Sequence, residues 1–212
     1  LAIGENYISE DKLPEIRQIS DGMIREALNI EDEGDIVTIA PKLYMNTKVN
    51  GTSVIVVGVD PQEERQLKTW WRVAQGKYFE APDEALVGAM AAELLRFNVG
   101  DKITLNGAEV TVAGILEETG SNEDYQVFVP LETAQKAFDK EGFVSSIDVR
   151  ALCNACPTSD IASAINENMA GVRGVAVTQI AETEMGMLEK IKGFLFALAA
   201  ITLAVGCFGV VN

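Results

Sequence analysis

Histidine is absent from this sequence. Its absence excludes Ser-His-Asp and Cys-His catalysis, His-ligated zinc and c-type haem attachment. Basic residues are few, with 17 Lys and Arg against 32 Asp and Glu, so the formal net charge is -15. Because no basic run offsets this acidity, a phosphate backbone would be repelled, and nucleic acid is excluded as a partner.

Charged residues are also missing from one long stretch, residues 193–211, which reads GFLFALAAITLAVGCFGVV. As a helix this stretch would measure roughly 28 Å, close to the hydrocarbon thickness of a bilayer. The sequence therefore predicts a transmembrane helix there, and the alternative is a buried core helix. The chain begins without Met and stops at Asn212 directly after the apolar stretch, so we expect further membrane segments on both sides.

The rest of the chain has the composition of a folded protein, with 48% hydrophobic and 23% charged residues overall. Apolar residues at steps of three and four predict a helix over 12–31. Two β-hairpins are expected, one turning at Asn50-Gly51 and the other at Asn106-Gly107. Asn-Gly suits the type I′ turn because both residues tolerate positive φ angles.

Further elements are expected from apolar patterning and from turn residues. They are a short strand at 36–39 closed by Pro41, a strand entering a short helix within 84–97, strands at 127–129 and 144–150, a helix at 131–140, a helix face marked by Ile161, Ile165 and Met169, a strand at 175–177, and a helix from Glu182 into the apolar stretch.

This order of elements favours an α+β fold in which a split βαβ-type base carries an inserted small β-rich lobe, followed by a transmembrane helix. We assign the base to residues 1–65 and 143–185 and the lobe to residues 66–142. Residues 186–212 are expected to form a lever helix that enters the membrane over 193–211. A continuous helix at this point can act as a mechanical lever, and it is also a common way to attach a domain to a membrane.

A Cys-x-x-Cys pair, Cys153 and Cys156, lies between a predicted strand and a predicted helix. Outside the cytoplasm such a pair can form a structural disulfide that pins a loop. Free thiols, a redox site or a metal site are the alternatives, although a metal would need further Cys or His ligands that are not nearby. Cys207 lies in the apolar stretch and is interpreted as a packing residue.

An aromatic stretch comprises Trp70, Trp71, Tyr78 and Phe79. These side chains are the best candidates for a contact surface with a partner or a lipid-like substrate, and core packing beneath the lobe is the alternative. Acidic groups near residues 31–35 and 117–124 lack the DxDxDG spacing of a calcium loop, so they are interpreted as solvated surface.

Several strings share their order and spacing with one family: GKYF at 76–79, ALVG at 85–88, NVGDKITLNGAEVTVAGIL at 98–116 and VFVPLETAQ at 127–135. They are followed by the predicted lever helix and membrane span. In this respect the chain resembles the extracytoplasmic (periplasmic) core domain of MacB-like, FtsX-related ABC-transporter permeases.

The resemblance implies a permease subunit in the cytoplasmic (inner) membrane, with this domain on the extracytoplasmic side. It implies a homodimer or heterodimer of permeases, a cytoplasmic ABC ATPase that binds the ATP, and in some systems a periplasmic adaptor. ATP hydrolysis would drive export or lipoprotein handling through mechanotransmission. The chain itself would hold no catalytic, cofactor or metal site, in keeping with its lack of a GxxxxGK[ST] phosphate loop.

The orientation of the domain and its function each have an alternative. Lys190 and Lys192 flank the start of the apolar stretch, and a simple positive-inside interpretation would place the domain in the cytoplasm, but that rule is weak for long domains. The alternative function is a membrane-anchored extracellular binding or sensor domain without a transporter.

Overall fold

A computed structural model describes residues 7–29, 37–151, 158–176 and residue 192. They belong to two compact units, one within residues 1–156 and the other within 157–212, and each unit is considered by itself. The helices are α1 (Leu13–Leu28), α2 (Pro61–Leu67), α3 (Ala89–Leu95), α4 (Leu131–Ala137) and α5 (Thr158–Asn168), with 3-10 turns η1 (Glu10–Lys12) and η2 (Asn122–Tyr125). The strands are β1 (Ile8–Ser9), β2 (Val37–Val49), β3 (Thr52–Val59), β4 (Val73–Gly76), β5 (Glu84–Val87), β6 (Lys102–Leu105), β7 (Ala108–Leu116), β8 (Gln126–Pro130), β9 (Phe143–Val144) and β10 (Ser146–Ala151).

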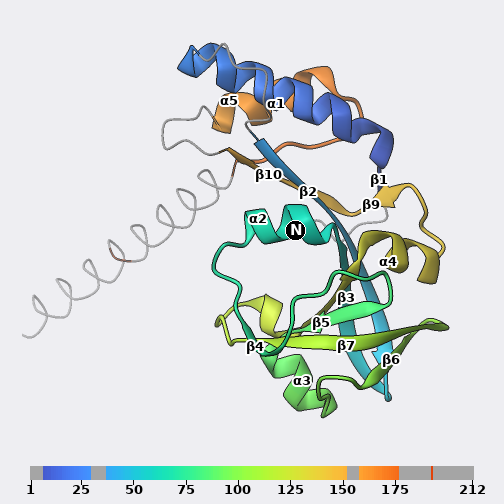
Figure 1. The fold of residues 1–212 in the computed structure, drawn as a ribbon. Helices are drawn as coiled ribbons and strands as arrows, with labels where there is room; N and C mark the ends of the chain where they lie inside the picture. The colour runs from blue at the N-terminus through green and yellow to red at the C-terminus, as the bar shows by residue number, and fades with distance from the viewer. Residues whose placement is uncertain (1–6, 30–36, 152–157, 177–191, 193–212) are drawn as a thin grey trace, which may run out of the picture. The chain divides into compact units, whose positions relative to one another are not determined.

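The first unit is built on one mixed sheet (Figure 1). Its strands follow the order β10-β2-β3-β8-β5-β7-β4, and β6 pairs with β7. The β3–β8 and β5–β7 pairs are parallel, and the other pairs are antiparallel. Strands β1 and β9 form a separate two-stranded sheet. A multi-stranded sheet with a few short helices confirms the predicted α+β class.

The two predicted hairpins are confirmed. β2 and β3 meet at Asn50 and Gly51, whose φ angles are 52° and 82°. β6 and β7 meet at Asn106 and Gly107, with φ angles of 46° and 96°. Positive φ at both central residues is the requirement of the type I′ turn, so in each hairpin the local sequence determines where the chain reverses.

Apolar side chains cover both faces of the sheet, because neighbouring residues of a strand point to opposite faces. On one face the core joins the sheet to α3 and α4, and it includes Val54, Val56, Val87, Ala91, Leu95, Leu105, Val127, Val129 and Ala134. On the other face a smaller core includes Val57, Val59, Phe79, Leu86, Leu116 and Phe128. A sheet with two buried faces is a firm support for whatever its loops and short helices present.

Strand β2 differs from the prediction. It does not close at Pro41 but continues for 13 residues to Val49. The ladder between β2 and β3 ends at the pair Lys42–Val59, so no β3 residue stands opposite Pro41. On its other side Pro41 pairs in register with Ile147 of β10. The proline's missing N–H therefore removes no bond to β3, and the strand can pass through it.

The strand predicted at 175–177 is also wrong where the structure describes it, since residues 175 and 176 are not in a strand. Just before them, the Asn166 side chain satisfies both backbone groups of Gly174, at 3.0 Å for the carbonyl and 2.9 Å for the N–H. The predicted lever and membrane segment at 193–211 lie outside the described residues. Among the helices that are described, none is both long and apolar enough to span a bilayer.

Candidate functional site

Helix α2 is a short polar helix that begins at a strong N-terminal signal. Asp60 caps it, because the Asp60 Oδ1 atom accepts hydrogen bonds from the backbone N–H groups of Gln62 at 2.9 Å and Glu63 at 3.0 Å. Pro61 occupies the first turn, where its missing N–H removes no helical bond. This cap places the side chains of α2 in a defined direction against three neighbouring elements.

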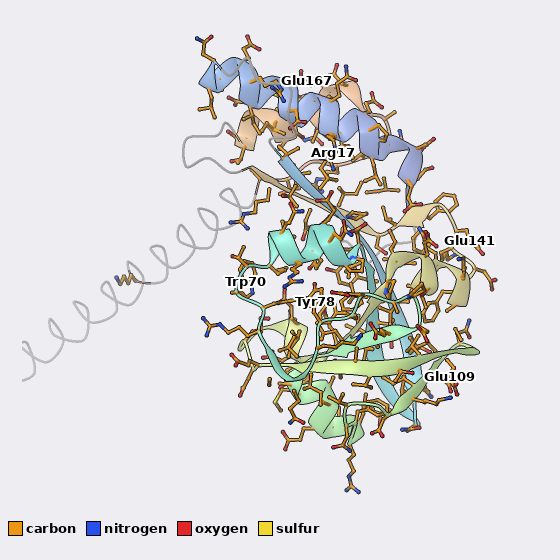
Figure 2. All side chains as sticks on the ribbon, in the orientation of Figure 1. Arg17, Trp70, Tyr78, Glu109, Glu141 and Glu167 are labelled. Carbon is orange, nitrogen blue, oxygen red and sulfur yellow. The ribbon has the colours of Figure 1, made fainter. Side chains whose placement is uncertain are left out.

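The first neighbour is α1. Arg17 on α1 places its Nη2 atom 3.2 Å from the Glu63 Oε1 atom, and its Nη1 atom donates to the Val37 carbonyl oxygen at 3.1 Å. Figure 2 labels Arg17 on α1, on the side that faces α2. One guanidinium thus connects α1 to α2 and to the start of β2, in the forked geometry that arginine provides.

The second neighbour is the sheet, through a buried ionic cluster. The Lys42 Nζ atom on β2 lies 2.9 Å from Glu64 Oε1 on α2 and 2.8 Å from Asp148 Oδ2 on β10. The side chains of Lys42 and Glu64 are only 5% and 1% exposed, while that of Asp148 is 46% exposed. We call these three residues the Lys42 triad.

The triad keeps its lysine charged. Burial acts to lower the pKa of Lys42, but the carboxylates of Glu64 and Asp148 outweigh it and raise that pKa above its usual value. A protonated lysine held between two carboxylates joins α2, β2 and β10 at one point. Removing one member of such a buried pair destabilises the fold, because the other charge is then left buried without a counter-ion.

The third contact lies at the C-terminal end of α2 and is again made by β10. Arg150 on β10 donates from its Nη1 atom to the carbonyl oxygens of Gln66 and Leu67, both at 3.0 Å. These carbonyls belong to the last turn of the helix, where no N–H of the helix reaches them. A cation at this end also interacts favourably with the helix dipole.

After α2 the chain enters residues 68–79, which we call the aromatic segment. The Trp71 Nε1 atom donates to Glu123 Oε2 at 2.6 Å, and Lys68 forms an ion pair with Glu123 Oε1. The Trp71 ring also packs on Phe128 of β8, with ring centroids 4.6 Å apart. Glu123 on η2 therefore fixes the start of the aromatic segment from two directions.

The other aromatic residues of this segment differ in exposure. Phe79 is fully buried in the core, and its ring stacks with Tyr78 at a centroid distance of 5.1 Å. The Arg65 guanidinium of α2 lies 5.4 Å from the centre of the Tyr78 ring. Trp70 is 54% exposed, with Lys68 Nζ 4.9 Å from its ring centre. Figure 2 shows both Trp70 and Tyr78 close to α2.

Comparison with protein families identifies the kind of domain to which α2, the Lys42 triad and the aromatic segment belong. Residues 4–179 match the family described as the MacB-like periplasmic core domain. The chain belongs to this family. The resemblance found in the sequence strings is thus confirmed, and the match covers residues 4–179.

Solved structures agree on the fold of the MacB-like domain. The extracellular domain of the noncanonic ABC-type transporter YknZ from Gram-positive bacteria is similar with a TM-score of 0.57 at 14% identity, over 82% of this chain and 90% of that one. The periplasmic region of MacB from Actinobacillus actinomycetemcomitans has a TM-score of 0.54 at 12% identity, over 77% of this chain and 81% of that one. No curated protein sequence matches the chain.

The predicted contact surface on the MacB-like domain is brought together only in part. Trp70, Trp71, Tyr78 and Phe79 do lie in one segment, but Phe79 is core and Trp71 is half-buried against its partners. Trp70 is the member with a large exposed area, so a contact with a partner through this segment stays a prediction that centres on Trp70. Tyr78 buries its hydroxyl oxygen without a hydrogen-bond partner.

The remaining predictions concern the cysteine pair, the acidic groups and metal binding. Cys153 and Cys156 lie outside the described residues. In the acidic loop, the interpretation as solvated surface is wrong for Asp124, which is buried and accepts hydrogen bonds from Thr119 and Gly120. Within the part of the chain that the structure describes, no three His, Cys, Asp or Glu side chains gather closely enough to hold a metal ion.

Sequence reasoning missed the Lys42 triad and Arg150. One signal was available: Lys42 is the single charge in the apolar run VTIAPKL at 37–43, and a lysine in a strand of that kind needs a buried partner. The identity of the partners could not be derived from the pattern, because Glu64 and Asp148 come from distant segments.

The ion pair between Lys77 and Glu84 predicts how the stability of the domain depends on pH. Glu84 accepts hydrogen bonds from Lys77 and from the backbone N–H groups of Glu80 and Ala81, and these lower its pKa from 4.5 to about 2. A depressed carboxyl pKa stabilises the fold above the unfolded value, and this contribution disappears as the pH falls from 4.5 towards 2. We expect Glu84→Gln to lower the free energy of unfolding at neutral pH, by an amount that shrinks below pH 4.5.

The measurement is denaturant unfolding of the native protein and of Glu84→Gln at several pH values between 7 and 2.5. Glu132→Gln provides the control, because the Glu132 side chain is 82% exposed in its pair with Lys136 and should contribute little at any pH. A difference between Glu84→Gln and the native protein that stays constant over this range would contradict the assignment.

Proposed function

We propose that this chain is the extracytoplasmic domain of an ABC-transporter permease subunit, which couples ATP hydrolysis in the cytoplasm to export or lipoprotein handling by mechanotransmission. The observation that carries the proposal is the family match over residues 4–179. The domain then lies on the extracytoplasmic side of the cytoplasmic (inner) membrane. ATP is bound by a partner ATPase subunit or domain, and the permease works as a homodimer or heterodimer, with a periplasmic adaptor as a further possible partner.

The geometry around α2 supports a mechanical role. The Lys42 triad and Arg150 tie a short helix to strands far apart in the sequence, and Glu123 fixes the segment that follows. A domain that transmits movement needs such connections, because loosely joined parts would absorb the movement. We also propose the division into a base (1–65 and 143–185) and a lobe (66–142), with residues 186–212 as the lever that enters the membrane.

The test is to purify the full-length parent protein from detergent-solubilised membranes, identify the proteins that accompany it and measure ATPase activity. We expect an ABC ATPase to be recovered with it, or ATPase activity within the same chain. A catalytically dead Walker-B variant of that ATPase serves as the control for contaminating activity. Recovery of the protein alone, with one or two membrane spans and no ATPase, would overturn the proposal and favour the anchored binding or sensor domain.

A further inference from the structure

Strand β10 is the element of the first unit that ends just before the second unit begins. It runs to Ala151, and the chain then continues through α5 towards the predicted lever. Two of its side chains connect it to α2. Arg150 binds the last carbonyls of the helix directly, and Asp148 is connected to it through Lys42 of β2, which also pairs with Glu64 of α2. These two side chains therefore connect the last strand of the first unit to α2 and β2.

On its far side, α2 leads into contacts with the rest of the sheet. Lys68 and Trp71 both bind Glu123 on η2. The N-terminus of α3 lies directly against the same turn, since a Cβ atom on Gly88 would stand 2.3 Å from the Glu123 carbonyl oxygen. Charged and backbone contacts thus run without interruption from β10 through α2 and η2 to α3.

We propose that Asp148 and Arg150 form a clamp that makes β10, α2 and the aromatic segment move as one rigid body with α3. This inference rests on the proposed function, because it identifies residues through which the mechanical coupling passes. The clamp acts on α2 at two places, at Glu64 through the shared lysine and at the C-terminal carbonyls through the guanidinium. Two attachments separated along the helix prevent both sliding and rotation of α2 against β10.

The clamp is distinguishable from a general contribution to stability. Asp148 is half-exposed, so water screens its attraction to Lys42, and Lys42 keeps the Glu64 carboxylate as a partner when Asp148 is removed. Arg150 satisfies carbonyls that solvent could also reach at a helix end. Removing the two side chains should therefore leave the domain folded while it frees α2 from β10. Coupling between elements, rather than melting temperature, is the property expected to change.

The experiment uses the full-length protein in nanodiscs, with spin labels at Val149 on β10 and Gln62 on α2, both of which are exposed. The labels are attached through encoded non-natural residues, since the chain contains three cysteines. Double electron–electron resonance then gives the distribution of distances between them. We expect a narrow distribution in the native sequence and a clearly broader one in Asp148→Asn/Arg150→Gln.

Two further variants make the test specific. Lys102→Gln/Glu109→Gln removes an exposed ion pair of the β6–β7 hairpin, 2.6 Å apart, and should leave the width unchanged. Arg150→Lys keeps Asp148 and a donor for the helix carbonyls, so its distribution should stay close to the native width. Equal widths in the native protein and the Asp148→Asn/Arg150→Gln variant would overturn the clamp. If that variant does not fold, Arg150→Gln alone decides in the same way.

The same samples separate failure of the clamp from failure of the proposed function. Widths are compared without nucleotide, so they need no ATPase. If no ATPase accompanies the protein but the clamp variant broadens the distribution, the clamp stands and the transporter assignment fails. If an ATPase is present and the widths are equal, the transporter assignment stands and coupling passes through other contacts.

Discussion

Replacing Lys42 by methionine is expected to lower the free energy of unfolding by about 3–5 kcal/mol. The substitution leaves the Glu64 carboxylate, 1% exposed, without its counter-ion in a site that water does not reach. Asp148 is half-exposed and can turn to solvent, so the destabilisation comes from the buried charge of Glu64. Denaturant unfolding followed by tryptophan fluorescence measures the change, because both tryptophans lie in the aromatic segment just after α2.

The matched control removes both charges. Lys42→Met/Glu64→Leu replaces the buried pair by apolar side chains of similar volume, a change that is often neutral or stabilising. We expect the double variant to recover most of the stability lost by Lys42→Met. A double variant as unstable as the single one would show that packing around Lys42, rather than an uncompensated charge, explains the loss.

Replacing Gly88 by alanine is expected to lower the free energy of unfolding by about 3 kcal/mol, the upper end of the usual cost of overpacking. A Cβ atom at this position would lie 2.3 Å from the Glu123 carbonyl oxygen and 2.6 Å from that of Asp124. Both are backbone atoms, which cannot rotate away, so η2 has to shift from the start of α3. The shift should also disturb the Trp71–Glu123 hydrogen bond and change tryptophan fluorescence in the folded state.

Gly22→Ala is the control for this substitution. Gly22 lies inside α1, and nothing stands within 4 Å of a Cβ atom placed there. Alanine is the better helix former by about 1 kcal/mol, so the same chemical change should stabilise the protein. Similar effects of the two variants would contradict the close approach of η2 to Gly88.

Elements with a local signature could be predicted from the sequence. The turns at Asn50-Gly51 and Asn106-Gly107 follow from two adjacent residues, and α1 follows from its apolar spacing. Helix α2 was missed because PQEERQL has almost no apolar periodicity. Its Asp60-Pro61 start is a helix signal that could have revealed it.

The candidate site could be predicted only in part, because it depends on the register of the sheet. Lys42 meets Asp148 since β10 pairs antiparallel with β2, with Ile147 opposite Pro41. No short-range pattern determines that register, and none places Glu64 above the same strand. The aromatic segment was visible as a composition feature, but its division into buried Phe79 and exposed Trp70 depends on how it lies on β8.

Strand β2 belongs to two ladders that overlap at a single residue. β10 pairs with β2 from Val37 to Lys42, and β3 pairs with it from Lys42 to Val49. Before Lys42 the strand is paired with β10, and after Lys42 it is paired with β3, so the backbone ladders share only this residue. The side chain at that residue is the buried ammonium held between two carboxylates. An electrostatic contact thus joins the two ladders at the single residue where their backbone pairing overlaps.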